Sequence, residues 1–371
     1  MSRLPGSFDV RRSLILVSLA AALAALGALI AASSGSARAK PKCFGQTATI
    51  VGTNGPNHIS GTARKDVIVA LGGDDTIETK NVKRNHGNDV ICGNGGGDKI
   101  QGNADTEKII GGPGNDTIAA GNGNDLVVGD NANPNGNESG PTGRDDLAGS
   151  GGSDFMVGDN WATGNVSGGA SDINFRAAGG GDTVVGDSAS AGNGNASGGG
   201  NDRLGGADGN DIVIGDSYAN TGNASGGGND DNNSGPGKDL AVGDSYSKSG
   251  MALIGGGTAR DELQAADGGD FGNKCKPEKS ACPDVFYGDG FVASCGKDAT
   301  IAAIRCQANR APGGGYDRLT PDRGNDFMNG GAPDPDGRGT SVDRCSGGAG
   351  VDTATRCKGI QTGFEHEIPF P

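Results

Sequence analysis

Apolar side chains recur at intervals of nine residues along most of this chain, and the positions between them are glycine-rich or polar. Large aliphatics fall at Ile59, Ile68 and Ile77, and after an interruption across residues 79–86 the spacing resumes at Ile91. An aspartate or a related polar residue stands two places before each of these aliphatics. The pattern therefore predicts a chain built from many copies, regular or interrupted, of one short unit.

Two adjacent copies are undisturbed between Gly111 and Val128, where the sequence reads GGPGNDTIA and then AGNGNDLVV. Each copy has glycines in its first half, an aspartate in sixth place (Asp116 and Asp125) and an aliphatic in eighth place. This form, G-G-x-G-x-D-x-U-x with U a large aliphatic, resembles the hemolysin-type (RTX) calcium-binding repeat family. The resemblance implies an all-β fold, a right-handed parallel β-roll solenoid stabilised by calcium. Each unit would contribute one short strand and one turn, and two units would make one coil.

The same resemblance implies which atoms hold the metal. Carbonyl oxygens of the glycine turns and aspartates of successive turns on the same side would share each Ca²⁺, an ion that takes six to eight oxygen ligands. The aliphatic in eighth place would point inward, whereas positions seven and nine would face outward. Asn57 and Glu107 stand in sixth place without being aspartate, so they are not counted as ligands. The predicted ligands, for several ions, are Asp66, Asp75, Asp89, Asp98, Asp116, Asp125, Asp145, Asp154, Asp182, Asp202, Asp211, Asp230, Asp239, Asp261, Asp270, Asp317 and Asp326.

A longer period appears after Val128. The tripeptide Val/Ile-Gly-Asp recurs at intervals of 28 or 29 residues, and each interval also holds a Gly-Asn-x-Ser-Gly segment. The interval equals two nonapeptides plus a loop of ten or eleven residues. Because an insertion once per coil always leaves a β-roll from the same edge, we expect these loops to stack into a polar ridge along one side. The tripeptides end at Asp130, Asp159, Asp187, Asp216 and Asp244, and the segments span 136–140, 164–168, 194–198 and 222–226.

Several interruptions break the regular spacing. Asp172 precedes Asp182 by ten residues rather than nine, and Asn174 and Asn232 stand where an aliphatic belongs. Residues 272–311 leave the pattern before it returns at Asp317 and Asp326. We therefore expect four parts: a signal peptide (1–39), a regular nonapeptide β-roll (40–128), a β-roll with loop-bearing coils (129–271), and a cysteine-containing interrupted part with a C-terminal cap (272–371).

The N-terminus has the features of an export signal. A start containing Arg11 and Arg12 precedes an apolar, alanine-rich run over 14–32, and Ala37-Arg38-Ala39 fits a small-x-small cleavage site. Cleavage there would start the mature chain at Lys40 and leave it without a membrane span. An uncleaved membrane anchor is the alternative, because the apolar run approaches spanning length. Either outcome predicts a secreted, extracellular or cell-surface protein.

Eight cysteines in an exported chain indicate disulfide bonds. A metal–thiolate site is the alternative, and the lack of any C-x-x-C pair disfavours it. Pairing the cysteines by their proximity in the repeat gives Cys43–Cys92, Cys275–Cys282, Cys295–Cys306 and Cys345–Cys357.

The composition indicates why such a fold would need metal. The chain has 74 glycines among 371 residues, 4% aromatic residues and a formal net charge of −14, which argues against nucleic-acid binding. One aliphatic per nine residues buries too little apolar surface to offset the ordering of a glycine-rich backbone, and facing aspartates repel one another. We therefore predict a protein that is loose in chelator and becomes β-rich when calcium is added.

These features favour a calcium-binding structural or adhesion module rather than an enzyme, with a cell-surface glycan or protein as the further partner considered. His58, His86 and His366 are far apart in the sequence, and we assign no catalytic residue. The alternative is a secreted hydrolase-type enzyme with its site in the inserted loops or in 272–311. Two smaller questions stay open. Trp161 is either an exposed contact residue or a loop filler, and the N-x-S sequons are either glycosylation acceptors or turn residues.

Overall fold

The computed structural model describes residues 39–79, 87–249, 251–254, 262–264, 285–287, 291–292, 317–320, 327–329, 344–345, 352–355, 357 and 364–368. The chain divides into two compact units, Met1–Lys40 and Pro41–Pro371, and all described strands lie in the second. The predicted signal peptide lies, except for Ala39, outside the described residues. The described residues include no helix long and apolar enough to cross a membrane.

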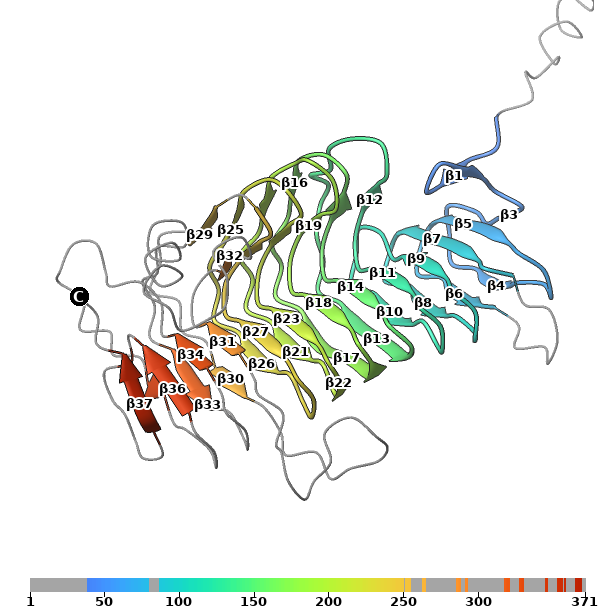
Figure 1. The fold of residues 1–371 in the computed structure, drawn as a ribbon. Coiled ribbons are helices and arrows are strands. Elements are labelled where there is room, and N and C mark those ends of the chain that lie inside the picture. The colour runs from blue at the N-terminus through green and yellow to red at the C-terminus, as the bar shows by residue number, and fades with distance from the viewer. Residues whose placement is uncertain are drawn as a thin grey trace, which may run out of the picture. The chain divides into compact units, whose positions relative to one another are not determined.

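The described strands form one antiparallel hairpin and five parallel sheets, in which successive coils of the chain stack side by side (Figure 1). The hairpin joins β1 (Lys42–Cys43) to β2 (Gln46–Thr47). The central sheet consists, in order, of β3 (Ile50–Val51), β5 (Val67–Gly72), β7 (Val90–Gly95), β9 (Lys108–Ile110), β11 (Leu126–Val128), β14 (Phe155–Val157), β18 (Thr183–Val185), β23 (Ile212–Ile214), β27 (Leu240–Val242), β31 (Val285–Tyr287), β34 (Phe327–Asn329), β36 (Asp352–Thr355) and β37 (Phe364–Ile368).

Two facing sheets lie opposite the central sheet across the core. The first consists of β4 (His58–Ser60), β6 (Thr76–Glu78), β8 (Lys99–Gln101), β10 (Thr117–Ala119), β13 (Asp146–Gly151), β17 (Ile173–Gly180) and β22 (Asp208–Gly209). The second consists of β21 (Arg203–Gly205), β26 (Asp231–Asn233), β30 (Glu262–Gln264), β33 (Arg318–Thr320) and β35 (Arg344–Cys345).

The inserted loops form two further sheets. The inner loop sheet consists of β12 (Ala132–Asn133), β15 (Trp161–Ala162), β19 (Ala189–Ser190), β24 (Tyr218–Ala219), β28 (Tyr246–Ser247) and β32 (Phe291–Val292). The outer loop sheet consists of β16 (Val166–Ser167), β20 (Ala196–Ser197), β25 (Ala224–Gly226) and β29 (Ala252–Ile254). The predicted all-β parallel β-roll with loop insertions is confirmed.

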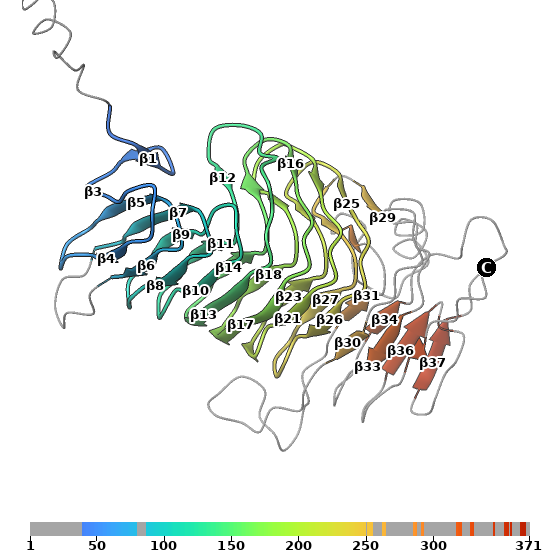
Figure 2. The ribbon, with the colours of Figure 1, turned by 180° about the vertical axis from the view of Figure 1, so that it is seen from behind.

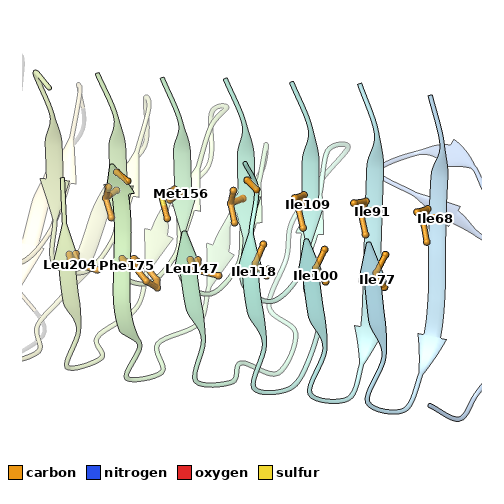
Figure 3. Close-up of a cluster of buried hydrophobic side chains, with 14 of the residues drawn as sticks. Ile68, Ile77, Ile91, Ile100, Ile109, Ile118, Leu147, Met156, Phe175 and Leu204 are labelled. Atoms are coloured by element: carbon orange, nitrogen blue, oxygen red, sulfur yellow. The ribbon is translucent and has the colours of Figure 1, made fainter. Parts of the chain in front are cut away.

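The core of the roll is a double column of aliphatic side chains between the central and facing sheets (Figure 3). On the facing side, Ile100 pairs in register with Ile118. On the central side, Ile109 pairs with Val127, and Val127 pairs with Met156. All five side chains are buried. The eighth-place aliphatics therefore point inward, as predicted, and each stacks on its equivalent one coil away.

A bulge in β17 explains the irregular spacing around Asn174. The register of β17 against β13 shifts, and Asn174 adopts a positive φ of 58°. The extra residue turns Asn174 out of the column and brings Phe175 into the buried, inward place. At the second irregular position, Asn232 stays buried in β26, where its side-chain Nδ2 donates a hydrogen bond to the backbone carbonyl of Val242 at 3.0 Å.

The outer face of the central sheet differs from the prediction that position nine faces outward and varies. Position nine is apolar and buried there, as Ile110, Val128, Val157 and Ile214 show. The prediction holds at positions of both facing sheets, where position nine is exposed at Ser60, Glu78, Gln101 and Asn233. The reason is that other parts of the chain cover the outer face of the central sheet.

The inserted loops cover most of this outer face. Val157, Val185 and Ile214 pack against Tyr218 and Tyr246 of the inner loop sheet, and the rings of the two tyrosines are stacked with centroids 5.4 Å apart. The loops leave each loop-bearing coil at the same place and lie on one side of the stacked coils in both views (Figure 1, Figure 2). The predicted stacking is confirmed, and the loops also enclose an apolar interior that the term polar ridge did not anticipate.

Asparagines tie the tips of these loops together. The amide of Asn165 donates to Oδ1 of Asn137 at 2.8 Å, and the same contact joins Asn195 to Asn165 and Asn223 to Asn195 at 2.9 Å. These asparagines of the N-x-S sequons therefore serve as turn residues. Trp161 is half-buried, 5.2 Å from the ring of Phe44, and so fills space between the hairpin and the loops.

Two predicted disulfides are confirmed. Cys43–Cys92 fastens the β1–β2 hairpin over the N-terminal end of the central sheet, with 5.7 Å between the Cα atoms, and Cys345–Cys357 joins β35 to the residue shortly after β36. The predicted pairs Cys275–Cys282 and Cys295–Cys306 lie outside the described residues.

Candidate metal centre

The sixth-place acidic residues form two files, one along each edge of the roll. The facing file precedes the strands of the facing sheets, and the central file precedes those of the central sheet. In the facing file, the amide of Asp98 donates to Oδ1 of Asp116, and the amide of Asp116 donates to Oδ1 of Asp145, both at 2.7 Å. In the central file, the amide of Asp125 donates to Oδ1 of Asp154 at 2.9 Å. Each carboxylate therefore holds the turn of the preceding coil.

The other carboxylate oxygen of these residues is buried and accepts no hydrogen bond. This is so for Oδ2 of Asp75, Asp98, Asp116, Asp125, Asp145, Asp154, Asp172, Asp182, Asp202 and Asp211. A buried charge without a partner is costly, so native proteins neutralise such groups by protonation, by an opposite charge or by a metal. The files thus present rows of oxygens that are suited to a cation.

Glycine in first place leaves room for these oxygens. A Cβ atom at Gly111 would collide with Oδ2 of Asp116 and with the carbonyl oxygen of Gly129 in the next coil. The same holds at Gly93, against Oδ2 of Asp98 and the carbonyl of Gly111. The glycine turn thus brings a carboxylate oxygen and a carbonyl oxygen to one place, and both are ligands that Ca²⁺ prefers.

Burial and like charge shift the titration of these groups. Burial, together with the carboxylates of Asp145 and Asp98, raises the pKa of Asp116 to about 9. Burial raises the pKa of Glu107 to about 9 and the pKa of Asp125 to about 7, with further contributions from neighbouring carboxylates. Without a bound cation, part of each file therefore holds protons at neutral pH, and binding a cation there would release them.

The described residues contain no group of three or more His, Cys, Asp or Glu side chains that could hold a metal ion. A site in the files would therefore have few carboxylates, and turn carbonyls would complete it, because Ca²⁺ readily takes backbone oxygens. On these grounds the residues present fit calcium.

The structure places most of the predicted ligands in these two files. Asp261, Asp270 and Asp326 lie outside the described residues, whereas Asp317 is described and buried. The predicted ligands that lie in the facing file are Asp75, Asp98, Asp116, Asp145, Asp202 and Asp230, and those that lie in the central file are Asp66, Asp89, Asp125, Asp154, Asp182, Asp211 and Asp239.

Two file members are absent from the predicted set. Asp172 accepts from the amide of Asp145 at 2.7 Å and donates its own amide to Asp202, so it is a full member of the facing file. A count of nine residues back from Asp182 misses Asp172, which lies ten residues before it, because the β17 bulge absorbs the extra residue. Glu107 occupies the central file, where its amide donates to Oδ1 of Asp125 at 2.8 Å.

Stacked coils with glycine turns, an aliphatic column and files of buried carboxylates define the class of calcium-type β-rolls. The family model of the RTX calcium-binding nonapeptide repeat matches residues 51–80, 101–133 and 196–221, with four copies of the repeat. The chain therefore carries RTX calcium-binding nonapeptide repeats, and the resemblance drawn from its sequence is confirmed. No curated protein and no solved structure matches the chain.

Proposed function

We propose that this protein is an exported structural and interaction module that folds on binding several calcium ions. The observation that carries the proposal is the pair of files in which buried aspartate oxygens, such as Oδ2 of Asp116 and Asp125, accept no hydrogen bond. Calcium would supply the positive charge that these rows of carboxylates lack among themselves. The binding free energy would then be part of the folding free energy, since the unfolded chain has no preformed site.

The ligands that we assign are the predicted sixth-place aspartates together with Asp172. Their Oδ2 atoms and the carbonyls of the first-place glycines would hold the ions, while their Oδ1 atoms keep the turns in place. We also retain the division at residues 39, 128 and 271 as a proposal. In its favour, the inserted loops begin directly after Val128.

The test is a calcium titration of the full chain, followed by circular dichroism and isothermal calorimetry. We expect a weak β signal in EGTA, a gain of β signal on adding CaCl₂, and heat that saturates over the same range. Identical spectra in EGTA and in excess calcium would refute coupled folding. Magnesium is the control, because its preference for near-ideal octahedral geometry suits these turns poorly.

Export and a surface role rest on the leader-like N-terminus and on the disulfides, which form in oxidising compartments. The exposed asparagine tips of the inserted loops offer a repeated polar surface that suits a glycan or protein partner. Calcium-loaded protein applied to a glycan array tests this role, and EGTA-treated protein is the control. The hydrolase alternative stays a prediction, because 272–311 lies, apart from β31 and β32, outside the described residues.

A further inference from the structure

The aspartates of the Val/Ile-Gly-Asp tripeptides lie where each inserted loop leaves the roll. Val128 pairs in register with Ile110, so Gly129 and Asp130 take the places that Gly111 and Gly112 hold in the regular coil. The loop departs at this point, and the chain returns to the roll just before Asp145. We call this meeting of the outgoing and returning strands the neck of the loop.

One oxygen of each neck aspartate closes the loop. The amide of Gly143 donates to Oδ2 of Asp130 at 2.9 Å. In the next two coils, the amide of Ala170 donates to Oδ2 of Asp159 and the amide of Gly200 donates to Oδ2 of Asp187, both at 3.0 Å. Oδ2 therefore has a structural role, fastening the returning chain to the outgoing chain in each coil.

The other oxygen is left without a hydrogen-bond donor. Oδ1 of Asp130, Asp159 and Asp187 accepts no hydrogen bond, although all three residues are 0% exposed. Backbone bonds align these residues, since the amide of Asp130 donates to the carbonyl of Asp159 and the amide of Asp159 donates to the carbonyl of Asp187. Parallel strands lie ~4.8 Å apart, so successive neck carboxylates are neighbours across one coil spacing.

Glycines and further oxygens lie beside these carboxylates. Added Cβ atoms at Gly169 and Gly200 would lie 3.3 and 2.9 Å from Oδ1 of Asp187. A Cβ atom at Gly158 would collide with Oδ2 of Asp172 and with the carbonyl oxygen of Gly186. Glycines thus border the neck, and hard oxygen atoms of both kinds, carboxylate and carbonyl, lie beside it.

We propose that the tripeptide aspartates form a third file of calcium sites, at the loop necks, with each ion held between the Oδ1 atoms of successive aspartates. The pairs on which we base the proposal are Asp130 with Asp159 and Asp159 with Asp187. Two carboxylates and nearby backbone carbonyls form each site, which agrees with the lack of any cluster of three or more acidic side chains among the described residues. These ions add to those of the nonapeptide files and fasten the inserted loops to the roll.

The proposal is tested by counting the calcium ions that the full chain binds when calcium is the only metal ion added. Equilibrium dialysis with metal analysis gives the number of ions bound per chain for wild type and variants, and circular dichroism in calcium checks folding. Asparagine keeps an oxygen for the closing hydrogen bond but removes the charge. Because the file begins at Asp130, we expect D130N to lose one ion, whereas D159N, between two neighbours, loses two.

Two variants serve as controls. D146N changes an outward aspartate that pairs with Arg176 and should bind as many ions as wild type. D116N removes a ligand of the nonapeptide file and should lose calcium whether or not the necks bind it. Wild-type ion counts in D130N and D159N, with a loss in D116N, would overturn the neck sites alone. A wild-type count in D116N would instead contradict the proposed function.

A second measurement uses the wild-type protein, so its result does not depend on whether the variants fold. Crystals of the full chain grown with calcium should give anomalous difference peaks between the carboxylates of Asp130 and Asp159, and between those of Asp159 and Asp187. Peaks along the nonapeptide files without peaks at the necks would show that the neck aspartates are protonated and only make the hydrogen bonds that close the loops. That result would overturn the proposal.

Discussion

The backbone amide of Asp98 donates a hydrogen bond to Oδ1 of Asp116, one coil further along the chain, at 2.7 Å. One carboxylate therefore has two tasks. Its Oδ1 holds the neighbouring turn, and its Oδ2 faces the space where we place calcium. The two tasks can be separated by substitution, because asparagine keeps an acceptor oxygen whereas alanine removes both oxygens.

We expect D116A and D116N to differ in calcium. D116A leaves the buried amide of Asp98 without an acceptor, which costs ~1–3 kcal/mol, in addition to the lost ion. D116N loses the ion but retains the acceptor, so it should be the more stable of the two. Urea unfolding of both variants in CaCl₂ measures the difference. Equal midpoints would show that the hydrogen bond between coils contributes nothing.

Close backbone approach requires glycine at position 112. Gly112 has a φ of +107°, and a Cβ there would collide with the carbonyl group of Asn94. We expect G112A to lose at least ~1–3 kcal/mol of unfolding free energy in calcium. G95A is the matched control, since a Cβ at Gly95 meets nothing within 4 Å. Thermal melts of both variants check this, and a loss of similar size in G95A would contradict the steric explanation.

The sequence predicts the roll and its inward-facing column of aliphatic side chains, because each nonapeptide contains the residues that form both a turn and a strand. Gly111, Asp116 and Ile118 each occupy the place that the repeat predicts. The outer face of the central sheet could not be predicted in the same way. Val128 and Val157 are apolar because the hairpin and the loops cover them, and a nine-residue unit considered alone contains no sign of that cover.

The departures from the nine-residue spacing have local structural causes. The predicted ligand set lacks Asp172 because counting by nine does not allow for a bulge, whereas a left-handed Asn174 absorbs one residue at small cost. The neck aspartates were visible as a tripeptide period, but their burial depends on loops that fold back over them. A signal was present in the sequence: an aspartate replaces the second-place glycine in every loop-bearing coil.

Phe175 should be the most sensitive position of β17. Its ring fills the inward place that Asn174 vacates and is 2% exposed. We expect F175A to cost about 3–5 kcal/mol, as is typical for a buried aromatic side chain. I173A, at a half-buried position of the same strand, is the control and should cost much less. Chemical denaturation in calcium measures both, and comparable losses would argue against the bulged register.

The Cys43–Cys92 disulfide should stabilise the cover of the central sheet rather than the roll itself. Replacing both cysteines by serine frees the hairpin from Val69 and Val90, and should cost about 2–5 kcal/mol. Exposure of these valines should raise the binding of a hydrophobic dye, while the β signal in calcium persists. Unchanged dye binding would indicate that the hairpin stays in place without its covalent bond.

The metal-free fold should be more stable in mild acid than in mild base. Folding raises the pKa of Asp116 from 3.8 to about 9 and that of Asp125 from 3.8 to about 7, chiefly through burial. Between these limits the folded state binds more protons than the unfolded state, so stability is greatest at low pH and is lost as pH rises through 7 and 9. We expect the weak β signal in EGTA to fall further between pH 5 and pH 8.

In saturating calcium the trend should reverse, because protons compete with the ion for the same oxygens. Circular dichroism in EGTA at pH 5 and pH 8, in parallel with urea unfolding in calcium at the same two pH values, tests both trends. A β signal in EGTA that rises with pH would contradict the view that uncompensated buried carboxylates destabilise the roll. A stability that rises with pH in calcium would show that the instability without metal comes from the carboxylates that bind the ions.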